Sequence, residues 1–299
     1  HKRSGYNGSL AGFRNRLQSM IFGYWHSGYD FCPTHASEFH FTTGAHSSMS
    51  TISLNEGSMI SSREEYDKYV WNDPEDFTLE HLIESAELLP DKMKYLICAP
   101  CGVLENVIAI VGFENLCMMI YDDSALAEEI FYQVGTRLIK NFRRILHYDF
   151  VGGIISNDDW GFNTQTMLPP DLMRKYVFPY HMQIVDDAHK AGKYAILHSC
   201  GNLEPVMDDI IHGMRFDGKH SFEDNICSIE DSYEKWKGQI ALLGGIDMNF
   251  LTLSTPEQVK ARCQNMLEIS RSAGGYALGS GNSIPDSVPY ANWVAMTEV

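Results

Sequence analysis

A histidine and a cysteine two positions apart are the residues of this chain best suited to holding a metal ion. They are His198 and Cys200, in the stretch YAILHSCGN. On an extended strand, residues two apart point to the same face, so an imidazole nitrogen and a thiolate sulfur could bind one ion together. This donor pair suits Zn²⁺. From the spacing alone, the alternative is a buried histidine bonded to a backbone carbonyl beside an inert core cysteine.

A second pair of thiols, Cys98 and Cys101, has the C-x-x-C spacing of a redox pair or of half a zinc site. No second C-x-x-C occurs in the chain, and no clear helix start follows the pair. We therefore favour two separate thiols in a turn and keep a C-x-x-C zinc site as the alternative.

Polar side chains that follow the strand-like runs are candidates for proton transfer and for substrate binding. Adjacent carboxylates point to opposite faces of extended backbone, so at most one of a neighbouring pair faces a site. Each carboxylate also has a structural alternative, as a helix cap or as a salt-bridge partner, for example of Lys219. The candidates for catalysis are Asp158, His220 and Asp247, and those for substrate binding are Asp159, Trp160, Glu223 and Asn282.

Short apolar runs that end in polar or glycine residues predict six strands. They span residues 93–98, 151–156, 194–198, 216–219, 240–244 and 276–279. Longer amphipathic runs between them predict helices over residues 123–147, 171–191, 203–212, 228–237, 255–273 and 289–297. We expect the second of these helices to bend at Pro179.

Strands that alternate with helices predict a parallel sheet with right-handed crossovers. Neither a G-x-G-x-x-G nor a G-x-x-x-x-G-K-[ST] segment occurs, so an open nucleotide-binding sheet has no support. A (β/α)8 TIM barrel would bring the six polar strand ends to one mouth. We predict a single barrel domain over residues 1–299, with an irregular segment over 1–90 that covers part of the barrel and clear β/α repeats over 91–299.

The composition narrows the classes of partner and compartment. Lys plus Arg is 23 and Asp plus Glu is 39, which gives a formal charge of −16 and argues against a nucleic-acid or anionic-membrane surface. No apolar run approaches the ~20 residues of a membrane span. Seven scattered cysteines do not form a disulfide framework and favour the cytoplasm. The start lacks both a Met and the apolar core of a signal peptide, so we expect N-terminal sequence to be missing.

Several motifs occur in a consistent order from about residue 60 to the end of the chain. They are NDDWG at Asn157–Gly161, the stretch Pro169–Lys193, HSCGN at His198–Asn202, KHSFED at Lys219–Asp224, GGID at Gly244–Asp247 and GSGNSIP at Gly279–Pro285. Together they resemble the uroporphyrinogen decarboxylase superfamily, and the ordered set is far more specific than any single motif. The resemblance implies a (β/α)8 barrel that performs either metal-free decarboxylation or cobalamin-dependent methyl transfer.

The H-x-C pair resembles the methyltransferase branch, where such a pair binds zinc with a further cysteine after the last strand. The resemblance implies Zn²⁺ at His198 and Cys200, a small-molecule methyl donor or thiol acceptor, and a corrinoid carried by a partner protein. Asn282 stands where the third thiolate is expected, so either a carboxylate or His220 replaces it, or the site binds zinc more weakly.

Two other functions stay open at this point. A decarboxylase-like lyase needs cations for a carboxylated substrate, and Arg14, Arg16 and Arg63 are the candidates near the start, with Lys219 after a strand. A barrel that binds a ligand without turnover is the third reading. We expect no nucleic-acid or membrane partner, and a homodimer is the assembly to test.

Overall fold

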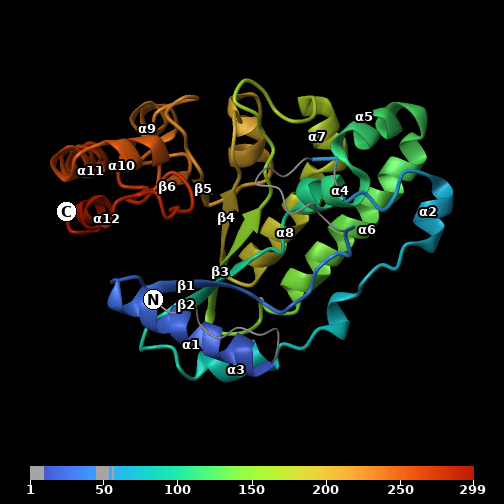
Figure 1. The fold of residues 1–299 in the computed structure, drawn as a ribbon, viewed down its shortest axis with the longest axis horizontal. Coiled ribbons are helices and arrows are strands. Elements are labelled where there is room, and N and C mark those ends of the chain that lie inside the picture. The colour runs from blue at the N-terminus through green and yellow to red at the C-terminus, as the bar shows by residue number, and fades with distance from the viewer. Residues whose placement is uncertain (1–9, 45–53, 56) are drawn as a thin grey trace. The chain divides into compact units, whose positions relative to one another are not determined.

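The chain has an α/β fold in which the strands are parallel. The structure is a computed structural model that describes residues 10–44, 54–55 and 57–299 (Figure 1). It divides into two compact units, one made of His1–Asn157 with Lys175–Tyr194 and the other of Asp158–Arg174 with Ala195–Val299.

The first unit contains three parallel strands in sequence order. The register pairs His35 with Cys98 and Cys98 with Ile155, so the carboxyl ends of the three strands lie at one edge. The strands are β1 (Phe31–His35), β2 (Lys94–Cys98) and β3 (Val151–Asn157).

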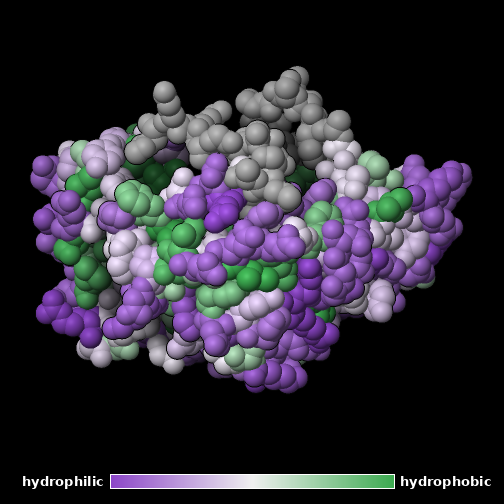
Figure 2. Space-filling view, turned by 90° about the horizontal axis from the view of Figure 1, so that it is seen from below, coloured by the Kyte–Doolittle hydropathy of each residue, from purple (hydrophilic) through white to green (hydrophobic). Residues whose placement is uncertain are grey.

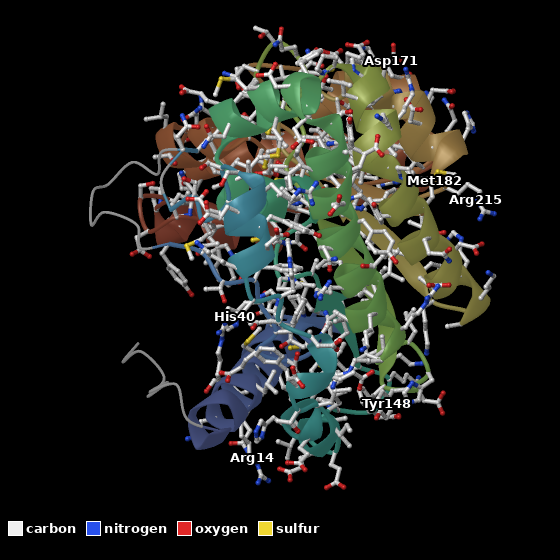
Figure 3. All side chains as sticks on the ribbon, turned by 90° about the vertical axis from the view of Figure 1, so that its right-hand side faces the viewer. Arg14, His40, Tyr148, Asp171, Met182 and Arg215 are labelled. Carbon is white, nitrogen blue, oxygen red and sulfur yellow. The ribbon has the colours of Figure 1, made fainter. Side chains whose placement is uncertain are left out.

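Helices of the first unit pack around these strands. The longest is α6 (Ser124–Arg143), which begins where the Asp123 side chain accepts the Leu126 N–H and buries Leu126, Ile130 and Val134. Helices α1 and α3 lie side by side (Figure 1), and a 3.6 Å ion pair joins Arg14 (Figure 3) to Glu84 there. The helices are α1 (Leu10–His26), α2 (Arg63–Lys68), the 3-10 helix η1 (Pro74–Asp76), α3 (Glu80–Ala86), α4 (Val103–Val111), α5 (Phe113–Asp122), α6 and α8 (Phe178–Lys190), while α7 (Pro170–Tyr176) crosses the boundary between the units.

The second unit contains the remaining strands, again parallel and in sequence order. His198 pairs with His220, Lys219 with Leu242, and Leu242 with Tyr276. This register brings the carboxyl ends of neighbouring strands to one edge of the unit. The strands are β4 (Tyr194–His198), β5 (Gly218–His220), β6 (Ala241–Leu243) and β7 (Tyr276–Ala277).

The helices of the second unit follow its strands in turn. In α11, a capping box at Thr255 and Gln258 starts the helix, and Val259, Cys263 and Met266 bury one face. The helices are the 3-10 helix η2 (Glu204–Val206), the π-helix η3 (Asp209–Gly213), α9 (Ile229–Trp236), α10 (Met248–Leu253), α11 (Pro256–Ser270) and α12 (Tyr290–Thr297).

All six predicted strands are present, but two other expectations were wrong. The helix expected over 171–191 is interrupted at Val177, close to the bend expected at Pro179: it ends at Tyr176 and restarts at Phe178, because Pro179 fits the first turn of a new helix, where no N–H is needed. The run 203–212 forms 3-10 and π turns instead of an α-helix. The segment 1–90 contains the strand β1 and the helices α1, α2 and α3, so part of it is regular.

The parallel α/β fold is thus confirmed, and closure of an eight-stranded barrel stays a prediction, since the described residues contain seven strands. Among these residues, no helix alone is long and apolar enough to cross a membrane; α4 and α5 reach that length and composition only as a pair, with a 94° bend between them. On the face shown in Figure 2, hydrophilic residues predominate and hydrophobic ones form short patches between them.

Candidate metal centre

Three potential metal ligands meet at the ends of the strands of the second unit. They are Asp159, His198 and Cys200, and their ligand atoms all lie within 4.8 Å of one another. His198 ends β4, Cys200 follows two residues later, and Asp159 lies in the loop after β3. In the part of the chain that the structure describes, this is the one group of three or more His, Cys, Asp or Glu residues with such spacing.

The distances within this triad suit a zinc ion. The Nε2 of His198 lies 4.0 Å from the Sγ of Cys200. Around a tetrahedral zinc ion, an imidazole nitrogen and a thiolate sulfur are about 3.6 Å apart, so closure by a few tenths of an ångström would bring both into bonding range. A thiolate and a carboxylate would also balance the two charges of Zn²⁺, which lowers the cost of placing the ion in a partly buried site. The donor set therefore fits the metal predicted from the sequence.

Backbone contacts hold Asp159 and Cys200 together. The Oδ1 of Asp159 accepts the Cys200 N–H at 2.8 Å, and the Gly161 N–H donates to the Cys200 carbonyl at 3.2 Å. Gly201 has φ +85°, and a Cβ added there would collide with the backbone of Gly161. Only glycine at position 201 therefore allows the two ligand-bearing loops to approach this closely.

Three further side chains contact the atoms of the triad. Asn282 donates from Nδ2 to the Cys200 Sγ at 3.3 Å, and its Oδ1 accepts the Ser283 N–H at 2.7 Å. The Ser221 Oγ lies 3.8 Å from the same sulfur. The Nδ1 atoms of His198 and His220 are 2.7 Å apart. The position expected to carry a third thiolate thus contacts the sulfur instead of replacing it.

Burial sets the protonation of these groups in the metal-free protein. Burial, and then the charge of Asp159, raise the pKa of the Cys200 thiol to about 12. Burial lowers the pKa of His198 and brings that of His220 to about 4, so both rings are neutral near pH 7. A metal ion would therefore displace the thiol proton of Cys200 and find His198 ready to bind.

Two of the predicted residues are buried beside the triad. The Asp158 side chain is fully buried, and its N–H donates to the His198 carbonyl at 2.9 Å. Trp160 is also fully buried, and its backbone N–H donates to the Ser199 Oγ at 3.1 Å. Both lie next to Asp159 in sequence, and these backbone bonds join the Asp159 loop to the segment that carries His198. Their catalytic and substrate-binding roles stay predictions.

Asp247 has a structural task that accounts for both of its carboxylate oxygens. Its Oδ1 accepts the N–H groups of Asn249 and Phe250 at 2.8 and 3.0 Å, which caps α10, and its Oδ2 accepts the Asp224 N–H at 3.0 Å. This is the helix-cap alternative that the sequence left open. The catalytic role predicted for Asp247 has no further support in these contacts.

A small cavity of about 30 Å³ lies beside Glu223 and Lys219. Lys219 is buried, donates from Nζ to the Ser221 carbonyl at 2.5 Å and lies 4.1 Å from the centre of the Phe222 ring. Burial lowers the pKa of Lys219 to about 8, although Cys200 and Glu223 oppose the shift. The salt bridge to Lys219, which was the structural alternative for Glu223, does not form, and the ammonium group bonds to backbone instead.

The C-x-x-C pair lies in the first unit, at the end of β2, and α4 begins two residues after Cys101, so the expectation that no helix starts after the pair was wrong. Burial raises the pKa of Cys98 to about 12, whereas Cys101 is exposed with φ +61°. All seven cysteines are free thiols, and the described neighbours of this pair add no third ligand of the His, Cys, Asp or Glu type within reach. These observations agree with separate thiols in a turn.

Asp159 is the residue whose part in the site the sequence did not assign. It was expected to bind substrate, and the structure places it among the metal donors. The adjacent carboxylates Asp158 and Asp159 pointed to one group facing the site, but their spacing could not say which. The bond between His198 and His220 was not predicted, because it depends on the register between β4 and β5, which neither segment shows by itself.

Solved structures of other proteins share the fold of this chain. A solved methyltransferase from Methanosarcina mazei is similar over 96% of this chain and 84% of its own, with a TM-score of 0.67 and 15% identity. A putative vitamin-B12 independent methionine synthase from Listeria monocytogenes is similar over 96% of this chain and 85% of its own, with a TM-score of 0.50 and 13% identity. No curated protein sequence matches this chain.

The family assignment comes from the sequence as a whole. The model of the family described as uroporphyrinogen decarboxylase (URO-D) matches residues 53–299. This match includes the strands and loops that carry Asp159, His198, Cys200 and Asn282. Because it covers most of the chain, the protein belongs to the uroporphyrinogen decarboxylase family.

Proposed function

We propose that this protein is a zinc-dependent methyltransferase that moves a methyl group between a small substrate and a separate corrinoid protein in the cytoplasm. The observation that carries the proposal is the meeting of Asp159, His198 and Cys200 within 4.8 Å at the ends of the strands. The similarity in fold to a methyltransferase agrees with it. Metal-free decarboxylation has no use for such a donor set.

Asp159 takes the place of the third thiolate in this proposal. Its carboxylate and the Cys200 thiolate supply two negative charges, and neutral His198 supplies a nitrogen donor. Three protein ligands leave one position of a tetrahedral zinc ion for a substrate atom. Zinc bound there would act as a Lewis acid that lowers the pKa of a substrate thiol or polarises a methyl-ether oxygen.

Neighbouring groups of the chain would hold the ligand atoms around this open position in place. Asn282 donates a hydrogen bond to the Cys200 sulfur and so shares in stabilising its negative charge. The Asp159 carboxylate is held by the Cys200 N–H, so its two oxygens are not equivalent. The methyl carrier would be a corrinoid protein, and the small partner a methyl donor or a thiol acceptor.

A decarboxylase-like lyase is the alternative within the same family. Such an enzyme needs cations aimed at substrate carboxylates. Lys219 is the cation that the sequence places after a strand, and its ammonium group is buried against the Ser221 carbonyl and the Phe222 ring. That arrangement gives a carboxylated substrate little to bind, which places the lyase second.

The test begins with metal analysis of the purified protein and of its Cys200→Ser variant. We expect about one zinc per chain in the first and strong loss in the second. Mixing the zinc-loaded protein with a methylated corrinoid protein and a panel of thiols and methoxyaromatics should then change the cobalt absorption spectrum. Zinc that survives Cys200→Ser but is lost in Cys98→Ser would move the site to the C-x-x-C pair. Carbon dioxide release from a porphyrinogen, without any cobalt change, would favour the lyase.

A further inference from the structure

We infer that His220 is a positioning residue that fixes the tautomer of His198, so that the His198 Nε2 carries a lone pair and faces Cys200. The inference rests on the proposed metal site and concerns how the chain prepares one of its ligands. It assigns His220 neither a bond to metal nor a proton-transfer role.

Two hydrogen bonds in series carry the argument. The Nε2 of His220 lies 3.1 Å from the Ser280 carbonyl oxygen, and its Nδ1 lies 2.7 Å from the Nδ1 of His198. The two imidazole rings are stacked, with their centroids 4.9 Å apart and their planes 28° apart. Both nitrogens of His220 are therefore engaged, one with backbone and one with the candidate ligand.

The carbonyl group at one end sets the direction of both bonds. A carbonyl oxygen only accepts, so the Nε2 of His220 carries the hydrogen. The Nδ1 of neutral His220 is then an acceptor, and the hydrogen between the two rings belongs to the Nδ1 of His198. Neutral His198 has its remaining lone pair on Nε2, the atom that lies 4.0 Å from the Cys200 sulfur. A metal ion needs that lone pair.

We call the two bonds in series, Ser280 carbonyl to His220 and His220 to His198, the histidine relay. The backbone around His220 leaves room for this relay. Gly244 has φ +75°, and a Cβ added there would collide with the Ser280 carbonyl oxygen and lie 2.8–2.9 Å from the His220 ring. Strand pairing places His198 opposite His220, and a bridge between Ile246 and Ser280 holds the carbonyl in place. The relay thus crosses three neighbouring segments of the second unit.

The relay predicts a measurable preference in the metal-free protein. In long-range ¹H–¹⁵N spectra of protein labelled at histidine, we expect the His198 ring to be protonated at Nδ1 and the His220 ring at Nε2. Single His→Phe variants assign the two rings. A His198 ring protonated at Nε2 would overturn the inference, whether or not the protein binds zinc.

Substitutions at His220 test the effect on the metal. His220→Phe keeps a ring of similar shape and removes both nitrogens, and we expect the zinc dissociation constant to rise by about 10- to 100-fold. His220→Asn can still accept from His198 and should recover part of the affinity. The control is His181→Phe, which removes a buried histidine bonded to the Ser156 hydroxyl in the first unit and should leave zinc affinity unchanged. Affinity is measured by competition with a chromophoric chelator on proteins whose folding is checked by circular dichroism.

The outcomes separate this inference from the proposed function. Folded His220→Phe protein with wild-type zinc affinity would refute the positioning role and leave the metal site standing. Wild-type protein that binds no zinc would refute the metal site, and the tautomer spectrum would still decide the relay. Weaker zinc binding in His220→Phe with partial recovery in His220→Asn supports both.

Discussion

Replacing Asp159 with asparagine separates the two tasks of this carboxylate. Its Oδ1 accepts the Cys200 N–H at 2.8 Å, and the group also lies within 4.8 Å of the other two donors. An asparagine carbonyl oxygen can keep the first bond, but it has no charge and is a poorer donor to zinc. The variant should therefore fold normally and bind metal weakly.

The expected magnitude follows from the number of ligands. Structural zinc sites with four ligands bind with about 10–16 kcal/mol, or about 2.5–4 kcal/mol for each ligand. Since an amide oxygen remains near the ion, we expect a loss of about 2–3 kcal/mol, which is about 30- to 150-fold in the dissociation constant. The metal-free variant should unfold within about 0.5 kcal/mol of the wild type. Asp159→Ala, which leaves the Cys200 N–H without its acceptor, should cost about 1–3 kcal/mol.

The assay is zinc competition with a chelator, paired with urea unfolding of the metal-free proteins. Asp171→Asn is the matched control, because it removes a carboxylate whose side chain is 94% exposed in the same unit (Figure 3). Zinc affinity in Asp159→Asn within threefold of the wild type would show that the carboxylate is not a ligand. Equal weakening in Asp171→Asn would show that overall charge, and not coordination, sets the affinity.

Three more predictions concern the surroundings of the triad. Because the pKa of buried Lys219 falls from 10.5 to about 8, the folded protein releases this proton first, and its stability in urea should rise by up to about 3 kcal/mol between pH 8 and 10.5 relative to Lys219→Met. Asn282→Ala removes the hydrogen bond to the Cys200 sulfur, so alkylation of that thiol in metal-free protein, followed by mass spectrometry, should slow by about fivefold to tenfold. Arg262→Leu should cost about 1–2 kcal/mol near neutral pH, because the Arg262 side chain is only 14% exposed and pairs with Glu230. Burial raises the pKa of Glu230, but the ion pair with Arg262 lowers it by more, so the pKa lies below the ordinary glutamate value. The stability that the ion pair contributes is therefore fully present above the ordinary glutamate pKa. The thermal midpoints of wild type and Arg262→Leu should converge as the pH falls through the depressed pKa.

The strands and most of the later helices were predictable because their apolar patterns are simple. Helices α4 and α5 were missed. In α4 the reason is physical: the stretch VLENVIAIV is buried on nearly all sides, so it lacks the broad polar face that marks an amphipathic helix. Strand β1 was missed because it is short and contains Pro33, which reads as a breaker and is tolerated in a strand at the edge of its unit. The segment 203–212 shows that a periodic spacing of apolar residues predicts a helical backbone but does not distinguish an α-helix from a 3-10 or a π-helix.

The candidate site was predictable only as far as single segments allow. The spacing of His198 and Cys200 is a property of one short segment at the end of β4 and can be read without knowing any other part of the chain. The place of Asp159 among the metal ligands depends on its bond to the Cys200 N–H in another loop. The bond of His220 to His198 depends on the register between two strands. Such relations between segments are set by packing, which a single sequence does not display.

The contact between Gly161 and Gly201 bears on which ions the protein would accept. Because the two loops touch through their main chains, the donors Asp159 and Cys200 cannot move apart to surround a larger ion. The site would therefore select by radius as well as by donor chemistry: it suits a small tetrahedral ion and disfavours calcium, which needs six or more oxygen ligands at longer distances.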